Sequence, residues 1–188
     1  MFERLISKLA RHLDKAKIPY MIIGGQAVLL YGTPRLTKDI DITLGISIER
    51  VSDIVGICKS AKFNILPENY TDFISKTFVL PVEDKTSGIR VDFIFSFTPY
   101  EKQAIERSKK VQIGSASANF ASVEDVIIHK IFAGRARDME DVKNMMLKNK
   151  KLNKRYIRKW LAAFDHASDD TELTELFERT LNEIKKLR

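Results

Sequence analysis

Two aspartates lie two residues apart in an apolar segment, and their spacing indicates metal chemistry. Asp39 and Asp41 alternate with Ile40 and Ile42. On a β-strand, residues two apart project from the same face, so both carboxylates leave one side of a strand predicted over residues 38–44. Neighbouring carboxylates repel each other and resist burial as anions, which favours a cation between them. Oxygen ligands without histidine or thiol indicate Mg²⁺ or Mn²⁺.

A glycine pair precedes these acids and has the properties of a phosphate-binding turn. Gly24 and Gly25 follow a strand predicted over residues 20–23 and precede a helix predicted over residues 26–31. A backbone without side chains lets a phosphate approach closely, and the first amides of the following helix can donate to it. Three further side chains before the acids are candidates for contacts with phosphate oxygens: Arg35, Thr37 and Lys38.

A third acid occupies another apolar strand, predicted over residues 89–95. Asp92 follows Arg90 by two positions, so the two side chains share a face. If this strand lies beside the first, Asp92 completes a site of three carboxylates that can hold two metal ions. Each feature alone is common among surface and loop residues, so the interpretation depends on their combination.

The other elements predict a mixed sheet followed by helices. Amphipathic spacing predicts helices over residues 2–17 and 47–62, and further strands are expected over 78–82 and 110–113, the latter as the last strand. A helix capped by Ser122 is expected to end near Gly134, and the chain is predicted to be helical from Arg137 onward, with the final helix opening at Asp169 and Asp170.

Strands and helices alternate only in part, which predicts an α+β fold with a mixed sheet rather than a doubly wound one. We expect two domains: residues 1–121 form the sheet core and residues 122–188 form a C-terminal helical bundle.

Residues 18–147 resemble the polymerase-β-like nucleotidyltransferase superfamily. The pattern Ile23-Gly24-Gly25, a spacer of thirteen residues and Asp39-Ile40-Asp41-Ile42 is similar to the signature of that superfamily. The form GGQAVLLYGTPRLTKDID is similar to the AbiEii-type branch, known from abortive infection and type IV toxin–antitoxin systems. That branch tends to show a lysine, an arginine and an Asp-x-x-Asp pair, matched here by Lys130, Arg135 or Arg137, Asp138 and Asp141.

The resemblance implies a nucleotidyltransferase-like mixed sheet flanked by helices, with an NTP and two divalent ions on the sheet. Asp39 and Asp41 would hold the metals that carry the triphosphate, Asp92 would complete the site, and Lys130 would contact the triphosphate. The implied enzyme moves a nucleoside monophosphate from the NTP to a hydroxyl of RNA, a protein or a small molecule and releases pyrophosphate. A cognate antitoxin is an implied partner.

Lys130 is also informative by itself, because it lies in the apolar stretch VIIHKIFAG. Burying an ammonium group without a partner is costly, so we expect a triphosphate or the three aspartates to face it. If the helix continues past Gly134, Lys130, Gly134, Arg137 and Asp141 lie near one face. An ion-paired helix face, with Arg137 paired to Asp141, explains the same residues without a ligand.

The excess positive charge is concentrated in residues 148–159. The chain carries 32 basic and 25 acidic residues, a net charge of +7, and this segment holds seven cations and no acid: Lys148, Lys150, Lys151, Lys154, Arg155, Arg158 and Lys159. This segment, called the basic run below, is typical of a solvated helix start, and it is also typical of an RNA-binding surface. Both interpretations stay open, and the second makes RNA a candidate acceptor.

Composition excludes several classes of protein. A single cysteine rules out an internal disulfide and a cysteine-based zinc site, and favours a cytoplasmic setting. The longest uncharged stretch, residues 18–34, contains Gly-Gly and Gln and is too short to span a bilayer. Two alternatives to the enzyme remain: a non-catalytic nucleotide-binding or regulatory module, and an RNA-binding protein in which the paired aspartates are incidental.

Overall fold

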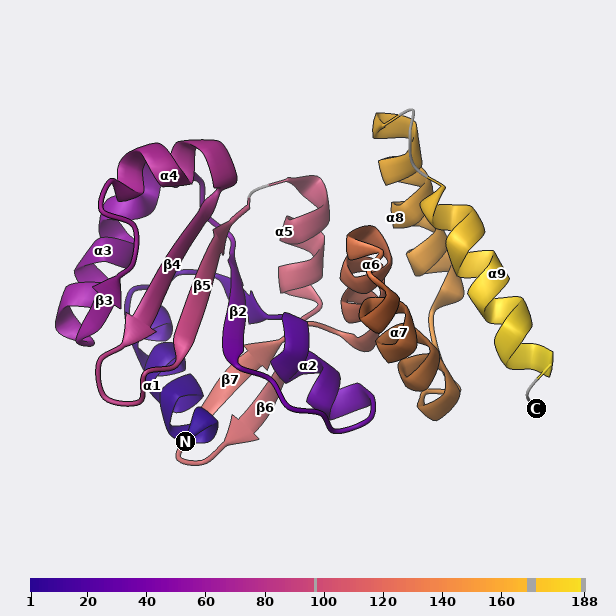
Figure 1. Cartoon of the computed structure of the whole chain (residues 1–188), viewed down its shortest axis with the longest axis horizontal. Helices are drawn as coiled ribbons and strands as arrows, with labels where there is room; N and C mark the ends of the chain where they lie inside the picture. The colour runs from indigo at the N-terminus through magenta and orange to yellow at the C-terminus, as the bar shows by residue number, and fades with distance from the viewer. Residues whose placement is uncertain (97, 169–171, 187–188) are drawn as a thin grey trace. The chain divides into compact units, whose positions relative to one another are not determined.

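A seven-stranded mixed sheet dominates the N-terminal part of the chain (Figure 1). The computed structural model describes residues 1–96, 98–168 and 172–186. The strands are β1 (Tyr20–Ile22), β2 (Asp39–Leu44), β3 (Phe63–Ile65), β4 (Val79–Asp84), β5 (Arg90–Phe95), β6 (Lys109–Ile113) and β7 (Ala116–Phe120). They lie in the order β3-β4-β5-β2-β1-β7-β6. The pairs β2–β5 and β1–β7 are parallel and the other pairs are antiparallel, so the predicted mixed sheet and α+β class are confirmed.

The chain divides into two compact units. The first, called the sheet unit below, comprises Met1–Gln26 and Leu36–Ala121, and the second, called the helical unit, comprises Ala27–Arg35 and the chain from Ser122 onward. The short segment Ala27–Arg35 therefore groups with the C-terminal helices. In sequence it lies between the two halves of the glycine–aspartate motif, which are Gly24-Gly25 and Asp39-Ile40-Asp41. A division into domains at residue 121 stays a prediction.

Five α-helices begin among the described residues before Ser122: α1 (Phe2–Lys15), α2 (Gly24–Tyr31), α3 (Val51–Ser60), α4 (Tyr70–Thr77) and α5 (Pro99–Glu106). The amphipathic α1 buries Leu9 and Leu13. Its Lys8 ammonium lies 2.7 Å from the carboxylate of Asp84, whose side chain points to the same face of β4 as the buried Leu80 and Val82. Because Val82 pairs with Val91 of β5, α1 reaches the apolar face of the sheet.

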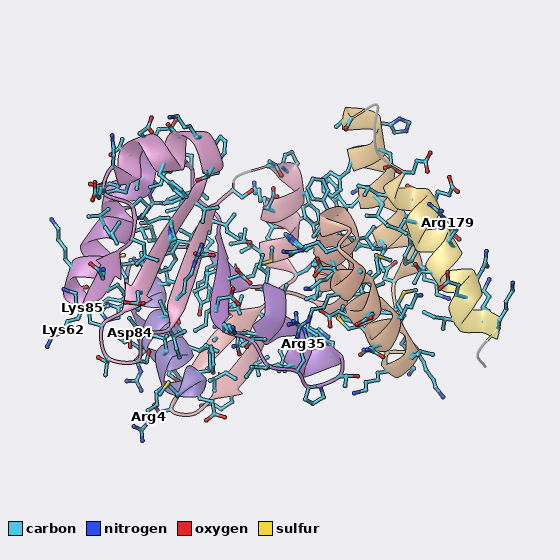
Figure 2. All side chains as sticks on the ribbon, viewed as in Figure 1. Arg4, Arg35, Lys62, Asp84, Lys85 and Arg179 are labelled. Atoms are coloured by element: carbon cyan, nitrogen blue, oxygen red, sulfur yellow. The ribbon has the colours of Figure 1, made fainter. Side chains whose placement is uncertain are left out.

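Asp84 also closes the turn between β4 and β5, where Figure 2 shows it near Lys62 and Lys85. Its carboxylate accepts hydrogen bonds from the amide and hydroxyl of Ser87. Burial would raise the pKa of Asp84, but hydrogen bonds from Lys8 and Ser87 outweigh burial and leave the pKa below its ordinary value. The group is therefore ionised and fixes α1 to the sheet.

The helical unit contains α6 (Val123–Ala133), α7 (Ala136–Lys148), α8 (Lys154–Ala167) and α9 (Leu173–Lys186). Ser122 caps α6 because its hydroxyl accepts from the amide of Asp125. The helix ends at Gly134, whose φ of 64° is left-handed. The phenol of Tyr156 donates to the buried Asp125 carboxylate over 2.7 Å, which fixes α8 against α6. Tyr156, an aromatic residue of the basic run, is thus part of the core.

The structure corrects several predicted elements. The strand at 110–113 is not the last, because β7 follows it as a hairpin partner. Strand β3 and helix α4 had no prediction. The predicted end of the Ser122-capped helix near Gly134 is confirmed, so the condition for one helix face from Lys130 to Asp141 is not met. The predicted helix start at Asp169 and Asp170 lies outside the described residues. Helices over residues 2–17 and 26–31 and strands over 38–44 and 89–95 are confirmed with small shifts.

No helix within residues 1–96, 98–168 and 172–186 has the length and apolar character needed to cross a bilayer.

Candidate functional site

The register of β2 and β5 brings the sequence-predicted acids together. The strands are parallel, and Asp41 pairs with Asp92 while Asp39 pairs with Arg90. Side chains at paired positions leave the same face of a sheet, so all four project from one side. The intervening Ile40, Ile42, Val91 and Phe93 are buried on the other face. One face of these two strands is therefore apolar core, and the other carries three half-buried carboxylates.

Arg90 partly neutralises these acids. Its Nε donates to the Asp92 carboxylate over 2.8 Å, and its side chain is 53% exposed. The hydrogen bond to Asp92 raises the pKa of Arg90, burial opposes this, and the charges of Asp92, Asp39 and Asp41 raise it further. The field of all three carboxylates thus reaches one guanidinium, which lies where a cation is favoured.

Gly24 lies directly against Asp41. A Cβ atom built on Gly24 would be 1.8 Å from Oδ2 of Asp41, and the φ of Gly24 is +60°. Both facts require glycine, because a side chain has no room and an L residue is strained in the left-handed region. The amide of Ile23 also donates to the carbonyl of Asp41 over 2.9 Å. The glycine turn and the paired acids, well separated in sequence, are adjacent in space.

The next polar residues have protein partners or face solvent. Gln26 and Thr37 are both buried, and the Gln26 Nε2 donates to the Thr37 hydroxyl over 2.7 Å. Gly25 is buried in the first turn of α2. Lys38 is exposed. Thr37, expected at a phosphate, is thus held by an amide within the sheet unit.

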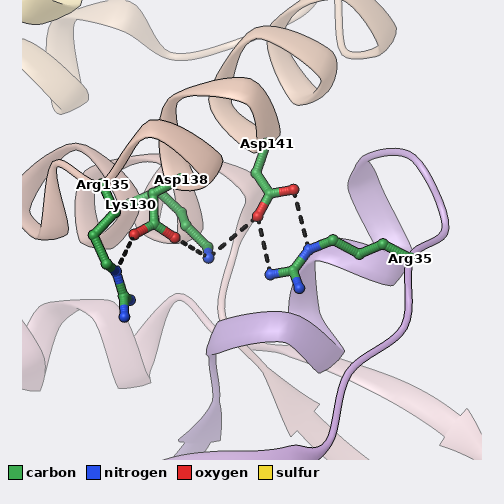
Figure 3. A network of polar contacts seen from close by, with 5 residues as sticks. All are labelled: Arg35, Lys130, Arg135, Asp138 and Asp141. Atoms are coloured by element: carbon green, nitrogen blue, oxygen red, sulfur yellow. Dashed lines mark hydrogen bonds and ion pairs between the residues drawn. The ribbon is translucent and has the colours of Figure 1, made fainter.

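A second group of charges lies in the helical unit, where Figure 3 shows five side chains joined in one network. Lys130 pairs with Asp138 and lies 3.2 Å from Asp141 Oδ2. Arg35 reaches Asp141 from the other side, through Nε at 3.2 Å and Nη2 at 3.0 Å. Arg135 donates to the second oxygen of Asp138 over 2.6 Å. The network joins α6, α7 and the segment after α2.

This network is more deeply buried than Asp39, Asp41 and Asp92, called the sheet acids below. Lys130, Asp138 and Asp141 are 7%, 3% and 5% exposed. Burial would raise the pKa of Asp138, but hydrogen bonds from Lys130 and Arg135 outweigh it and lower the pKa overall. Lys130 was expected to find its partner in a triphosphate or the sheet acids. Its ammonium is already compensated by Asp138 and Asp141, and the pairing expected between Arg137 and Asp141 is replaced by Arg35.

The sheet acids have the chemical type and the common orientation that a metal site requires. They supply oxygen ligands from adjacent strands, they are half-buried, and a guanidinium lies among them. No group of three or more His, Cys, Asp and Glu side chains in the described residues is arranged as a metal site. Asp92 instead turns to Arg90, so a metal would have to compete with that ion pair.

Sequence reasoning missed two polar contacts near the paired acids. It recognised that Arg90 shares the face of Asp92, but gave the guanidinium no role. It also passed over Gln26, whose partner is Thr37. A signal for Gln26 was available, since an amide between Gly25 and the apolar run of α2 needs a hydrogen-bond partner if it is buried.

The chain belongs to the family described as "Nucleotidyltransferase of unknown function (DUF6036)", whose model matches residues 1–186. The match includes both the sheet unit and the helical unit. The chain is therefore a member of a nucleotidyltransferase family, which agrees with the superfamily predicted from the glycine–aspartate motif. A comparison with curated proteins finds no match.

Solved structures support the same fold. The antibiotic-resistance factor ANT(2'')-Ia, in its solution structure, is 17% identical with a TM-score of 0.60, over 88% of this chain and 91% of that one. A nucleotidyltransferase-like protein from Paracoccidioides brasiliensis is 17% identical with a TM-score of 0.57, over 94% and 91% of the two chains. A putative nucleotidyltransferase from H. pylori is 17% identical with a TM-score of 0.52, over 99% and 96%.

Proposed function

We propose that the chain transfers a nucleoside monophosphate from an NTP to a hydroxyl acceptor, with release of pyrophosphate and with Mg²⁺ or Mn²⁺ as cofactor. The observation that carries this proposal is the pairing of Asp41 with Asp92 on one face of the sheet, with Gly24 against the Asp41 carboxylate. The family description supports the same reaction class.

Each sheet residue has a distinct task in this proposal. Asp39 and Asp41 would hold the metal that carries the triphosphate, and Asp92, released from Arg90, would complete the site. When bound, divalent ions stabilise the charge that develops on the entering and leaving oxygens. The backbone of Gly24 and Gly25, at the start of α2, would donate to phosphate oxygens, because early helix amides have no partners within the helix.

Four cationic or hydroxyl side chains belong to the same proposal as phosphate contacts. Lys38 is exposed and can reach an anion without breaking a protein contact. Arg35, Thr37 and Lys130 would have to exchange or share their partners Asp141, Gln26 and Asp138. Lys38 is therefore the simplest contact of the four, and the other three would act only with a rearrangement of the local pairs.

RNA is our proposed acceptor, supported by the basic run. All seven cations of residues 148–159 are exposed. Lys148 donates to the Gly32 carbonyl and Arg158 pairs with Glu178, which leaves five for phosphates: Lys150, Lys151, Lys154, Arg155 and Lys159. Neutralising Lys150, Lys151, Lys154 and Arg155 should weaken RNA binding and flatten its salt dependence, by about one unit of log–log slope for each phosphate that is no longer bound. Unchanged binding at every salt concentration would leave the run a solvated helix face.

A small-molecule hydroxyl is the second candidate acceptor. One solved structure of ANT(2'')-Ia contains adenylyl-2''-tobramycin, at 17% identity and a TM-score of 0.60 over 88% of this chain and 97% of that one. In that complex the adenylyl group is on an antibiotic. The two acceptors are separated by the basic-run variant, which should lose transfer to RNA and keep transfer to a small molecule.

Finer assignments go with this proposal. Membership of the AbiEii-type branch, with a toxin role and a cognate antitoxin, depends on Lys130, Asp138 and Asp141, which do lie together. A cytoplasmic location is supported by the single cysteine, Cys58, which is buried and free. A non-catalytic nucleotide-binding module and a simple RNA-binding protein are the alternatives that the following experiment addresses.

The test is incubation of the purified protein with each α-labelled NTP, Mg²⁺ and total cellular RNA, followed by a search for labelled product. We expect label on an acceptor, pyrophosphate release, and loss of both in EDTA. NTP binding without transfer to RNA, protein or small-molecule acceptors would indicate a non-catalytic module. RNA binding without NTP binding would indicate that the acids are incidental.

A further inference from the structure

Between the glycine turn and the paired acids, the chain makes an excursion that is held at its base and at its tip. Gln26 and Leu36 belong to the sheet unit, whereas the nine residues Ala27–Arg35 belong to the helical unit. We infer that Lys148 and Asn149, at the end of α7, are positioning residues that hold this connector, here defined as Ala27–Arg35, and so fix Gly24 and Asp39 at its ends. The inference rests on the proposed function for its catalytic consequence.

The tip of the connector is held by one face of α7. The Lys148 Nζ donates to the carbonyl of Gly32 over 2.7 Å, and the Asn149 Nδ2 donates to the carbonyl of Tyr31 over 2.9 Å. Asp141 receives both arms of the Arg35 guanidinium. Asp141 and Lys148 are seven residues apart, which places them on the same side of α7, and Asn149 is the residue at which the helix ends.

The helix and the connector also approach closely at Gly32. A Cβ atom on Gly32 would be 3.2 Å from the Met145 Cγ and 3.2 Å from Val28. Met145 is itself fully buried on α7. Polar contacts from Lys148 and Asn149 thus border a packed apolar contact. The carbonyls of Tyr31 and Gly32, at the C-terminus of α2, accept hydrogen bonds from these two side chains.

The base of the excursion is closed by Gln26 and Thr37. The two residues are 6% and 8% exposed, and their side chains are joined by the 2.7 Å hydrogen bond. Gln26 directly follows Gly25, and Thr37 precedes Asp39 by two residues. The bond therefore joins the two halves of the motif where each meets the connector.

Holding the connector has a defined chemical consequence. The two ends of the connector are already joined by the Gln26–Thr37 hydrogen bond, so Lys148 and Asn149 add order to the residues between them, where ordering a residue costs about 1–2 kcal/mol of backbone entropy. We infer that this added order limits small displacements of the two ends. In the proposed reaction, the turn at Gly24 would bind phosphate and Asp39 would hold the metal, so the distance between them must stay fixed. A misplacement of about 1 Å can cost roughly 10²-fold in rate. Lys148, a member of the basic run, thus acts through the connector rather than through RNA.

The experiment compares Lys148→Met and Asn149→Leu, singly and together, with matched controls. Lys148 is exposed and Asn149 is half-buried, so neither substitution removes a core side chain. Lys143→Met removes the same charge elsewhere on α7, where Lys143 pairs with the exposed Glu183. Asn144→Leu makes the same change at another half-buried asparagine of α7. Hydrogen–deuterium exchange of the full chain without metal or NTP gives the first readout. We expect faster exchange within residues 27–38 in the double variant only, with α6 and α8 unchanged.

Kinetics give the second readout. The double variant should lose roughly tenfold in kcat/KM for NTP, and the Mg²⁺ concentration for half-maximal rate should rise, which a mere loss of folded protein does not change. Exchange equal to wild type would overturn the inference, as would faster exchange with unchanged kinetics. If wild type itself transfers no nucleotide, the proposed function fails, while the exchange experiment still decides whether α7 holds the connector.

Discussion

Two groups of charged side chains in this chain differ in burial and in how far their charges are compensated. On the sheet, Asp39, Asp41 and Asp92 face the mostly exposed Arg90. In the helical unit, Asp138 and Asp141 are surrounded by three cations, and both acids are almost fully buried. The first group is half-buried and lies beside one exposed guanidinium. The second is charge-compensated inside the protein.

The difference indicates where a ligand is needed. Buried charges are stable only when paired and hydrogen-bonded, and the helical network meets that condition by itself. The sheet acids repel one another and are held beside a glycine that has room for no side chain. An excess of carboxylates favours a cation, so our proposal places the metal on the sheet and not in the charge-compensated helical network.

The largest expected effect breaks the sheet side of the comparison. Asp39→Asn should lower nucleotide transfer by about 10³-fold or more, because the metal supplies several kcal/mol of transition-state stabilisation. Its thermal unfolding temperature should stay equal or rise, since one repelling charge is removed. Transfer assays and calorimetry on the same preparation measure both. A variant that unfolds readily would show that Asp39 is structural.

The next effect tests the helical side. Asp138→Asn should lower the free energy of unfolding by about 3–5 kcal/mol at pH 7, because it leaves Lys130 buried with weaker compensation. The lowered pKa of Asp138 gives a sign to the pH dependence. Its contribution is complete above the ordinary carboxyl pKa of about 3.9 and is lost as pH falls through the lower folded value. Urea unfolding at pH 7 and pH 3 should therefore show a gap between wild type and variant that narrows in acid.

Gly24→Ala should both strain the backbone and disturb the proposed metal site. The left-handed φ costs an alanine about 1–2 kcal/mol, and its methyl group would displace the Asp41 carboxylate. We expect a modest fall in stability with a larger fall in Mn²⁺ affinity. Gly88→Ala is the control, because Gly88 is also left-handed but has open space around its Cβ position. Equal loss of Mn²⁺ affinity in both variants would remove Gly24 from the site.

The smallest effect sharpens the role of Arg90. Arg90→Gln removes the cation that holds Asp92, so divalent ions no longer compete with an ion pair. Exposed pairs are worth about 0.2–1 kcal/mol, which predicts a gain of a few fold in Mn²⁺ affinity without NTP. Isothermal titration measures it. A weaker Mn²⁺ affinity would mean that Arg90 orients the acids rather than occupying a cation position.

Sequence alone predicted the parts of the molecule whose signals are local. Alternation located β2 and β5, and the spacing of Asp39 and Asp41 placed them on one face. The register of Asp41 with Asp92 could only be a hypothesis, because strand pairing is set by the whole sheet. Strand β3, with three residues, is too short to give a periodic signal.

The partners of the polar side chains were harder to predict. Lys130 was recognised as needing a partner, but Asp138 and Asp141 approach it only because Gly134 ends α6 and lets α7 turn back. Asn149 and Lys148 donate hydrogen bonds to the carbonyls of Tyr31 and Gly32, which are far away in sequence. Such tertiary contacts have no local pattern, so the sequence does not distinguish Lys148 from the other cations of the basic run.

The most direct test of the central claim is Mn²⁺ binding to the wild-type chain with NTP, followed by electron paramagnetic resonance and compared with Asp41→Asn. Asp53→Asn is the control, because Asp53 is a half-exposed acid paired with Arg50 on α3. The account predicts that wild type and Asp53→Asn bind Mn²⁺ alike and that Asp41→Asn loses the bound signal. Equal binding in all three proteins would contradict it, because the cation site would then lie away from the paired acids.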